Sequence, residues 1–431
     1  MSISKNKIIK IFQYILALLL ILSTNSMYSY IRGFETLNTV YLLGFPAIVG
    51  CIILIHRNIE LKHVTRFVLC SFGLCMYIFV YLILQPNGSK STIQLLFIFI
   101  ILLMYFILFE NKGSFPNVLI YYKNLMVLIG LISFVLWVLG PLSEVISPSH
   151  IYTSWSSTGD YVKCDSYYYL LFSPQISGED DILSFFPTRF TSIFTEAPMC
   201  SFNFCLAFLI ESLFEKKKSV FKKIILLITI VASLSTTGYC FIVMYYMLKL
   251  FFYKNDSRFI KVIKPVIFIF FAIGSVIIII VLVNSKADTS SGSIRLDDFI
   301  ACFKTFCSYP VLGCGIGQSG KIQSFMATWR GKNTGLSTGF LQLLAQGGIY
   351  IFLLYLLAII SSLYKAIIYR DVNRFIFTIL VSFMLLLTVV EYKTIVMLIL
   401  MFFAFDMKQK KSSYSILINR GKNAKTKILK T

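Results

Sequence analysis

The chain has 431 residues, of which 57% are hydrophobic, 16% aromatic and only 14% charged. This composition excludes a soluble globular enzyme of this length and indicates a polytopic membrane protein. The net charge of +21 would suggest nucleic-acid binding in a soluble chain, but the basic residues lie mostly in short segments between apolar runs, where membrane topology explains them better.

The apolar runs predict an all-α protein with about twelve membrane-spanning helices, since most approach the ~20 residues that a bilayer core requires. In chain order, the expected spans are 8–22, 36–55, 64–84, 91–109, 118–140, 198–214, 219–234, 236–253, 265–283, 338–360, 375–389 and 394–405. They fall into three groups, within 1–140, 198–283 and 338–407.

Lysine and arginine gather in alternate segments between these spans. If the amino terminus is cytoplasmic, most of them lie on the cytoplasmic side, together with the basic tail at 408–431. The positive-inside rule therefore predicts that both termini are cytoplasmic, with the tail held against anionic lipid. Two long segments, 141–197 and 284–337, then face outward, where functional residues are expected.

The second outward segment has the pattern of a short amphipathic helix that begins near Ser291 or Ser293. Its apolar residues recur at helical spacing, at Leu296, Phe299, Ile300, Phe303 and Cys307. Its polar residues lie on the other face, at Arg295, Asp298 and Lys304. We expect a helix at the membrane surface, followed after Pro310 by a tight glycine turn whose backbone can approach a ligand. A structural surface helix with a flexible loop is the alternative.

Both outward segments contain an arginine near carboxylates. Arg189 precedes Glu196 by seven residues, and Arg295 precedes Asp297 and Asp298. An arginine fork suits a phosphate or a diphosphate, and a carboxylate can take a proton from an attacking hydroxyl group. Local salt bridges are the alternative.

Further binding candidates lie in the same two segments. Lys321, Arg330 and Lys332 can strengthen the field around an anion, and Tyr168 and Trp155 offer aromatic faces of the kind that stack on sugar rings. A solvated loop and an interfacial aromatic belt are the respective alternatives. The sequence has no metal-ligand pairs and no nucleotide-binding loop, so we expect no metal and no other cofactor.

Three motifs resemble those of the Wzy-type O-antigen and capsular polysaccharide polymerases and the related O-antigen ligases. They are RFTSIFTEAP at 189–198, LSTTGY at 234–239 and SGSIRLDDFIACFKTFCSYPVLGCGIG at 291–317. Ser337 and Thr338 stand where the ligases place a histidine, and Gln346 stands where glutamate is common. These differences favour a polymerase over a ligase and leave the general base unassigned.

The resemblance implies a fold related to the helical C-type glycosyltransferases. Such a polymerase transfers a growing glycan from undecaprenyl diphosphate onto the sugar of a new lipid-linked repeat unit. It acts at the outer face of the bacterial cytoplasmic membrane and needs no cofactor. By this resemblance, Arg189 and Arg295 would recognise the diphosphate, and Glu196 or Asp298 would act as base or hold the arginines.

The implied partners are the lipid-linked oligosaccharide, membrane lipid, and a chain-length regulator and a flippase of the same pathway, with no nucleic acid. The alternative functions are an O-antigen ligase, a lipid-linked oligosaccharide flippase or transporter, and a non-catalytic scaffold. A flippase would show two similar halves, charged spans and short outer loops, which this sequence does not.

Overall fold

The computed structural model describes residues 5–34, 36–56, 59–110, 115–156, 160–173, 188–252, 290–331 and 333–405. In these parts the protein is mostly helical, and five helices are long and apolar enough to cross a membrane. The prediction of a mostly helical protein is therefore confirmed, and the five apolar helices are compatible with the predicted membrane protein. The expected span at 265–283 and the basic tail at 408–431 lie outside the described residues.

Each expected span within the described residues corresponds to a helix or part of one. The helices are α1 (Lys5–Leu22), α2 (Leu37–His56), α3 (Leu61–Leu84), α4 (Ser89–Leu108), α5 (Asn117–Trp137), α6 (Ala197–Leu213), α7 (Val220–Ala232), α8 (Thr236–Phe252), α10 (Ser290–Ser308), α11 (Ser319–Gln323), α12 (Gly339–Ile368), α13 (Val372–Leu387) and α14 (Thr394–Phe405), with short helical turns η1 (Met27–Tyr30), η2 (Val138–Leu142) and η3 (Thr328–Arg330). Because α6, α7, α8, α13 and α14 have fewer than the ~20 residues of a full span, the number of spans stays a prediction.

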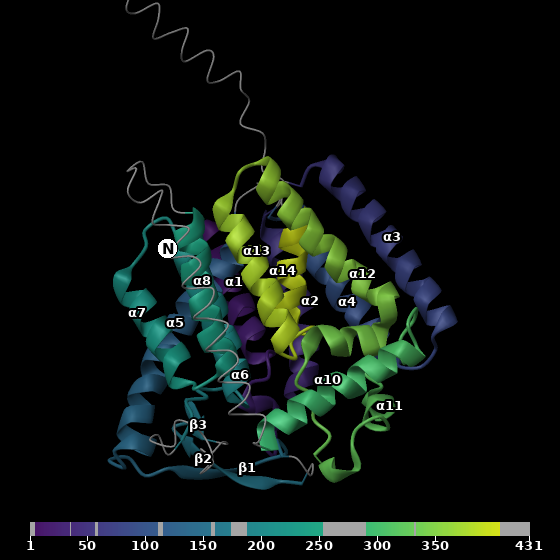
Figure 1. Cartoon of the computed structure of the whole chain (residues 1–431). Coiled ribbons are helices and arrows are strands. Elements are labelled where there is room, and N and C mark those ends of the chain that lie inside the picture. Colours follow the sequence, from purple (N-terminus) through teal and green to yellow (C-terminus); the bar gives the residue numbers. More distant parts are fainter. Residues whose placement is uncertain are drawn as a thin grey trace, which may run out of the picture.

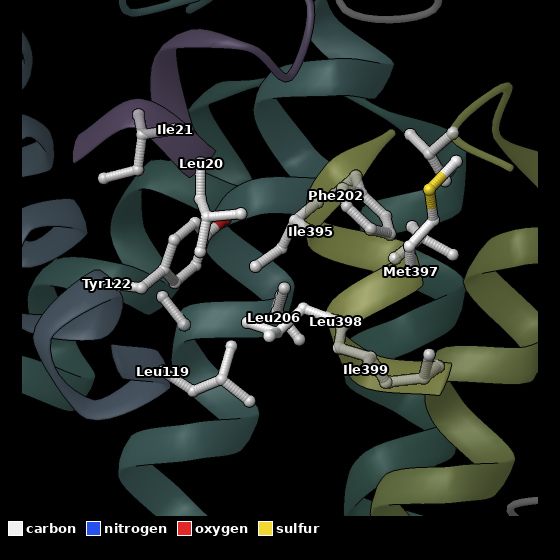
Figure 2. Close-up of a cluster of buried hydrophobic side chains, with 14 of the residues drawn as sticks. Leu20, Ile21, Leu119, Tyr122, Phe202, Leu206, Ile395, Met397, Leu398 and Ile399 are labelled. Carbon is white, nitrogen blue, oxygen red and sulfur yellow. The ribbon is translucent and has the colours of Figure 1, made fainter. Parts of the chain in front are cut away.

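The interior of the bundle is organised around α14. Its residues from Thr394 to Phe403 are all buried, which explains why this helix is apolar on every side. Figure 2 shows Ile395 and Leu398 of α14 directed into a cluster with Leu20 of α1 and Leu206 of α6. The short α14 is therefore enclosed by longer helices that stand between it and the surroundings of the bundle.

By contrast, α3 lies at the edge of the bundle (Figure 1) and exposes large apolar side chains along its length, among them Leu69, Phe72 and Ile83. A soluble protein would not leave so large an apolar surface in water. This surface fits the hydrocarbon core of a membrane.

The segments expected to face outward meet at one end of the bundle. Figure 1 shows the strands and α10 together at this end. Ser26, in the loop after α1, forms an isolated bridge with Phe194 of the first outward segment. Lys393, in the loop before α14, donates a hydrogen bond to Asn25. These contacts agree with the alternating topology predicted from the basic residues.

A second set of contacts joins α5 to the end of α6. Lys123 Nζ lies 2.7 Å from Glu211 Oε2 and 2.6 Å from Glu215 Oε2. The backbone N–H of Ser219 donates to the other oxygen of Glu211 at 2.8 Å. This buried lysine is thus fully compensated by two carboxylates within the protein.

The first outward segment contains a three-stranded antiparallel sheet, so the expectation of an all-α fold is wrong in this region. Its strands are β1 (Ser149–Thr153), β2 (Val162–Tyr167) and β3 (Leu171–Ser173), in the order β1-β2-β3. Side chains along β1 alternate between exposed and buried, as expected for a strand with one covered face. Ile151, on the covered face, stands opposite Cys164.

The glycine turn after α10 packs against protein, which corrects the expectation that its backbone approaches a ligand. Gly313, Gly315 and Gly317 all have positive φ. A Cβ atom on Gly313 would lie 2.5 Å from the nitrogen of Gly348, and one on Gly315 would lie 2.5 Å from the carbonyl oxygen of Asn87. The glycines therefore allow the turn to fit closely between α12 and the loop that joins α3 to α4.

Helix α12 is broken at Gly348, whose φ of 61° and ψ of −171° are not helical. The apolar run at 338–360 therefore forms two helices rather than the single span expected. The first ends beside α10. The second runs from position 349 to Ile368 and is about 30 Å long, enough to cross a bilayer core.

Replacing Gly348 by alanine should destabilise the protein by roughly 2 kcal/mol or more, because the left-handed backbone and the lack of room both penalise a Cβ atom. The thermal midpoint of the purified protein in detergent would measure this loss. Gly50→Ala in α2, where no atom lies within 4 Å of the added Cβ, is the matched control and should be neutral or stabilising. Equal midpoints for the two variants would contradict the proposed break.

Candidate functional site

The segment before α6 holds two of the expected site residues in place. Phe190 and Phe194 are fully buried and anchor this segment in the core. Arg189 and Glu196, at its two ends, are only half-buried. Ser192, between them, has a φ of 52°. A left-handed backbone conformation costs free energy for a residue other than glycine, and it is found preferentially at functional sites.

Helix α10 brings Arg295 to the same place. Arg295 lies on the inward side of this helix, three residues before the fully buried Asp298. It is close enough to Glu196 and Arg189 for their charges to influence its pKa. The structure therefore brings Arg295 to Arg189 and Glu196, which lie in the other outward segment of the sequence.

Lys393, a third cation of this cluster, was not predicted as a site residue from the sequence. It lies between α13 and α14, and its charge acts on Glu196. Lys393 donates a hydrogen bond to Asn25, whose backbone is also left-handed, with a φ of 50°. In the sequence, only its position in a short loop that is expected to face outward could have marked Lys393 as a site residue. We call Arg189, Glu196, Arg295 and Lys393 the outer charge cluster.

The guanidinium group of Arg295 has no hydrogen bond and no ion pair within 4.0 Å in the part of the chain that the structure describes. The carboxylate of Glu196 likewise accepts no hydrogen bond there, even from the first turn of α6 that it precedes. An arginine that is half-buried without a partner is costly. A bound anion would provide the missing partner.

Asp297 and Asp298, the acids next to Arg295 in the sequence, form ion pairs with Arg330 and not with Arg295. Arg330 Nη1 lies 2.8 Å from Asp298 Oδ1 and 3.3 Å from Asp297 Oδ2. Its Nε donates to the carbonyl of Asn333 at 2.8 Å, and its Nη2 donates to that of Gly335 at 2.9 Å. All three nitrogens are thus engaged, so the contacts of Arg330 favour a structural role over the expected ligand binding.

The positions that differ from the ligase pattern also have structural contacts. Ser337 donates to the second oxygen of Asp298 at 2.7 Å. Gln346 accepts a hydrogen bond from the backbone of Gly317 at 3.2 Å. Asp298 therefore fulfils one of its two expected roles, holding an arginine, but that arginine is Arg330. Arg330 and Ser337 therefore fasten the residues before α12 onto α10, whereas Gln346 fastens α12 to the glycine turn.

Burial works against every charge in the outer charge cluster. It lowers the pKa of Arg295; the charge of Glu196 opposes this shift and that of Arg189 adds to it. Burial also lowers the pKa of Lys393, and Glu391 and Glu196 oppose the shift. It raises the pKa of Glu196, against the attraction of Arg295 and Lys393. The four residues that define the cluster are three cations and one carboxylate.

Glu391, which is 1% exposed, lies beside this cluster. In the described residues neither of its carboxylate oxygens has a side-chain hydrogen-bond partner. Burial raises its pKa to about 8, although the charge of Lys393 partly opposes the shift. Glu391 is therefore mainly protonated at pH 7 and leaves the positive charge of Lys393 available to a ligand.

The remaining expected residues are distributed around the site. Trp155 packs edge-on against Tyr30, with ring centroids 5.0 Å apart, and the charge of Glu196 acts on Tyr30. The ring of Tyr30 therefore lies between Trp155 and Glu196 of the cluster. Tyr168 is exposed on the turn after β2, with no contact to the cluster among those described.

Lys321 lies at the far end of α10. Its ammonium group is 5.2 Å from the centre of the Tyr309 ring. Arg295 and Tyr309 are separated by 14 residues, almost all of them helical, or about 20 Å. Lys321 therefore does not join the outer charge cluster. Lys332 lies outside the described residues.

No protein-family model and no curated protein matches this chain. What the site can do therefore follows from its own chemistry. Two arginines and a lysine can bind a multiply charged anion, and Glu196 can accept a proton beside it.

Asp298→Ala should destabilise the protein by roughly 3 kcal/mol, because it leaves Arg330 buried with an incomplete set of partners. Thermal unfolding in detergent would measure the change. Asp165→Ala is a matched control: it breaks an ion pair of the same 2.8 Å length, with His150, that is about half exposed. Its cost should be below ~1 kcal/mol. A fully stable but inactive Asp298→Ala protein would instead assign Asp298 to the chemistry.

Glu391→Gln should change how stability depends on pH. Because the folded pKa of about 8 lies above the ordinary 4.5, the folded protein keeps a proton that the unfolded chain loses. The wild type should therefore lose stability as the pH rises from 4.5 to 8, by up to roughly 4 kcal/mol. The variant should match the wild type near pH 5 and be more stable than it at pH 9.

Thermal midpoints across this pH range would test the effect. The exposed Glu60 offers a control, because Glu60→Gln should leave the wild-type pH profile unchanged. Parallel profiles for the wild type and Glu391→Gln would show that Glu391 is ionised in the folded protein.

Proposed function

We propose that this protein polymerises undecaprenyl-diphosphate-linked oligosaccharide repeat units into O-antigen or capsular polysaccharide. It would be a glycosyltransferase of the outer face of a bacterial cytoplasmic membrane, with both termini in the cytoplasm. A relation to the helical C-type glycosyltransferases is part of this proposal. The observation that supports it most is the guanidinium of Arg295, which has no partner among the described residues and lies near Arg189 and Glu196 at one end of an apolar helical bundle.

The charges fit a diphosphate better than a singly charged anion. Arg295 and Lys393 both act on the one carboxylate, Glu196, and Arg189 acts on Arg295, so a ligand with two negative charges would suit this group of residues. The planar guanidinium of Arg295 can donate two parallel hydrogen bonds to phosphate oxygens. Because the cluster lies where the outward loops meet the bundle, its ligand would have a charged group at the membrane surface.

The reaction needs two things that the cluster can supply. When the bond between the sugar's anomeric carbon and the diphosphate oxygen breaks, the leaving diphosphate gains negative charge, which Arg295, Arg189 and Lys393 would stabilise. The attacking hydroxyl of the acceptor sugar must lose a proton. Glu196 is the carboxylate in the cluster, it accepts no hydrogen bond from any residue that the structure describes, and burial makes it a stronger base.

Asp298 is a poorer candidate for the base. Both of its oxygens accept hydrogen bonds, from Arg330 and Ser337, and its side chain is fully buried. A base must reach the proton that it removes. We therefore assign the base to Glu196 and a positioning role to Asp298.

Arg295→Ala should slow chain growth roughly 100-fold or more, because it removes a donor to the developing charge. The surface glycan profile of the native host, with the variant replacing the wild type, would show single repeat units in place of long chains. Arg295→Lys should retain part of the activity, since it keeps the charge but loses the fork. Lys304→Ala, at an exposed site on the same helix, should leave the profile unchanged.

Membrane levels of each variant, measured by immunoblot, separate loss of function from loss of protein. If Arg295→Ala left the long chains intact, this assignment of the site would be wrong. If no repeat unit reached the outer face, the protein would be a flippase. If long chains formed but failed to join an outer-membrane lipid acceptor, it would be a ligase.

A further inference from the structure

Helix α10 packs against the protein through its polar and small residues. Asp298, Ala301, Cys302 and Thr305, which share one side of the helix, are all fully buried. Arg295 lies on the same side of the helix. The buried side of α10 therefore carries Arg295 and Asp298, whereas Lys304 is exposed.

The apolar side of α10 points away from the protein. Leu296 is 63% exposed, Phe299 49% and Phe303 50%, and Ile300 is also exposed. This orientation is the reverse of that of a surface helix in a soluble protein, which buries its apolar side. The expected amphipathic helix is thus present, and its apolar face lies open to whatever surrounds the outer end of the bundle.

This apolar face leads toward the surface of α3. The turn after α10 packs against the loop between α3 and α4, where Gly315 lies against Asn87. Val311 in this turn is exposed, and so are Ile83 and Leu84 at the adjoining end of α3. Figure 1 shows one end of α10 beside that end of α3. Exposed apolar side chains therefore extend from α3 through Val311 to Leu296.

The other end of this row reaches the outer charge cluster. Leu296 is the neighbour of Arg295 in the sequence, so one turn of α10 presents a cation inward and an apolar side chain outward. A ligand with a charged head and a long hydrocarbon chain can contact both. A lipid phosphate or diphosphate has this combination.

We propose that the outward face of α10, from Leu296 to Phe303, binds the isoprenoid chain of the lipid diphosphate whose head group lies at Arg295. This inference rests on the proposed function, because that function supplies the lipid diphosphate. The chain is covalently joined to the head group, so it begins within a few bonds of Arg295. The outward face of α10 is the adjoining apolar surface, and it leads from the cluster toward the lipid-facing surface of α3.

Photo-cross-linking tests this inference in the full-length protein, reconstituted in vesicles of phosphatidylethanolamine and phosphatidylglycerol. The photoreactive residue p-benzoylphenylalanine replaces Phe299 or Phe303 on α10, or Phe72 on α3 as a control that faces lipid elsewhere. The probe is radiolabelled undecaprenyl diphosphate. We expect labelling at positions 299 and 303 that excess unlabelled undecaprenyl diphosphate reduces at least tenfold and that excess undecaprenol does not reduce.

Arg295→Ala should lower the labelling at 299 and 303 by roughly tenfold, because the head group no longer holds the chain in place. Labelling at position 72 should not depend on Arg295 or on the competitor. Equal labelling at all three positions without competition would show that α10 contacts bulk lipid, and would overturn the inference. Absence of labelling at 299 and 303 would also overturn it.

A parallel binding measurement with inorganic pyrophosphate separates this inference from the proposed function. If pyrophosphate binds the wild type and not Arg295→Ala while positions 299 and 303 fail to react, the anion site stands and the chain lies elsewhere. If neither pyrophosphate nor undecaprenyl diphosphate binds, the proposed function fails as well.

A substitution on the outward face gives a second test that does not depend on the photoreactive residue. Phe299→Ser with Phe303→Ser should weaken the binding of undecaprenyl diphosphate roughly tenfold or more, through lost apolar contact. It should leave pyrophosphate binding unchanged, which also reports that the protein is folded. Equal loss of both ligands, or of neither, would contradict the inference.

Discussion

The ion pair between Arg330 and Asp298 determines the chemistry of the outer end of this protein. It joins the residues before α12 to α10 over 32 positions of the sequence and satisfies charges that are almost completely buried. Breaking such a pair is costly because it leaves the other charge alone in a low-dielectric environment. Its more important effect is on Arg295. By engaging Asp297 and Asp298, Arg330 removes the carboxylates with which Arg295 would otherwise form a local salt bridge.

A comparison of two clusters in the described part of the chain shows why that matters. Lys123 lies between Glu211 and Glu215, both within 2.7 Å, and is compensated within the protein. Arg295, by comparison, has no ion pair among the described residues, and the charge of Arg189 acts on it. The anionic substrate that we propose would supply the compensation that Arg295 lacks there.

The apolar runs of the sequence predicted where the helices lie, because the hydrophobic demand of a bilayer acts on each segment separately. The sheet was missed because Ser149–Thr153 is short and its alternation is visible over only five residues. The break in α12 was missed because hydropathy averages across Gly347 and Gly348, which do not interrupt an apolar run. Their effect depends on the glycine turn that packs against them.

The site was predictable in part. Arg189, Glu196 and Arg295 stood out as charges in outward segments, and the structure brings them together. The pairing of Arg330 with Asp298 and the approach of Lys393 to Glu196 depend on how distant loops meet, which no local pattern encodes. The two aspartates next to Arg295 in the sequence even suggested the wrong partner. Adjacency along a helix places Asp298 on the same side as Arg295, but tertiary packing decides which arginine it holds.

Reversed amphipathicity and unbalanced charge are two consequences of the same arrangement. Because α10 turns its polar side inward, Arg295 enters a partly buried site where its charge is strong, and the apolar side faces outward at no cost if lipid covers it. In water, a partly buried arginine and an exposed apolar helix face would both be unfavourable. At a membrane surface they would be compatible, since lipid would cover the apolar face and an anionic head group would neutralise the cations. The arrangement of α10 therefore fits the amphipathic ligand that we propose.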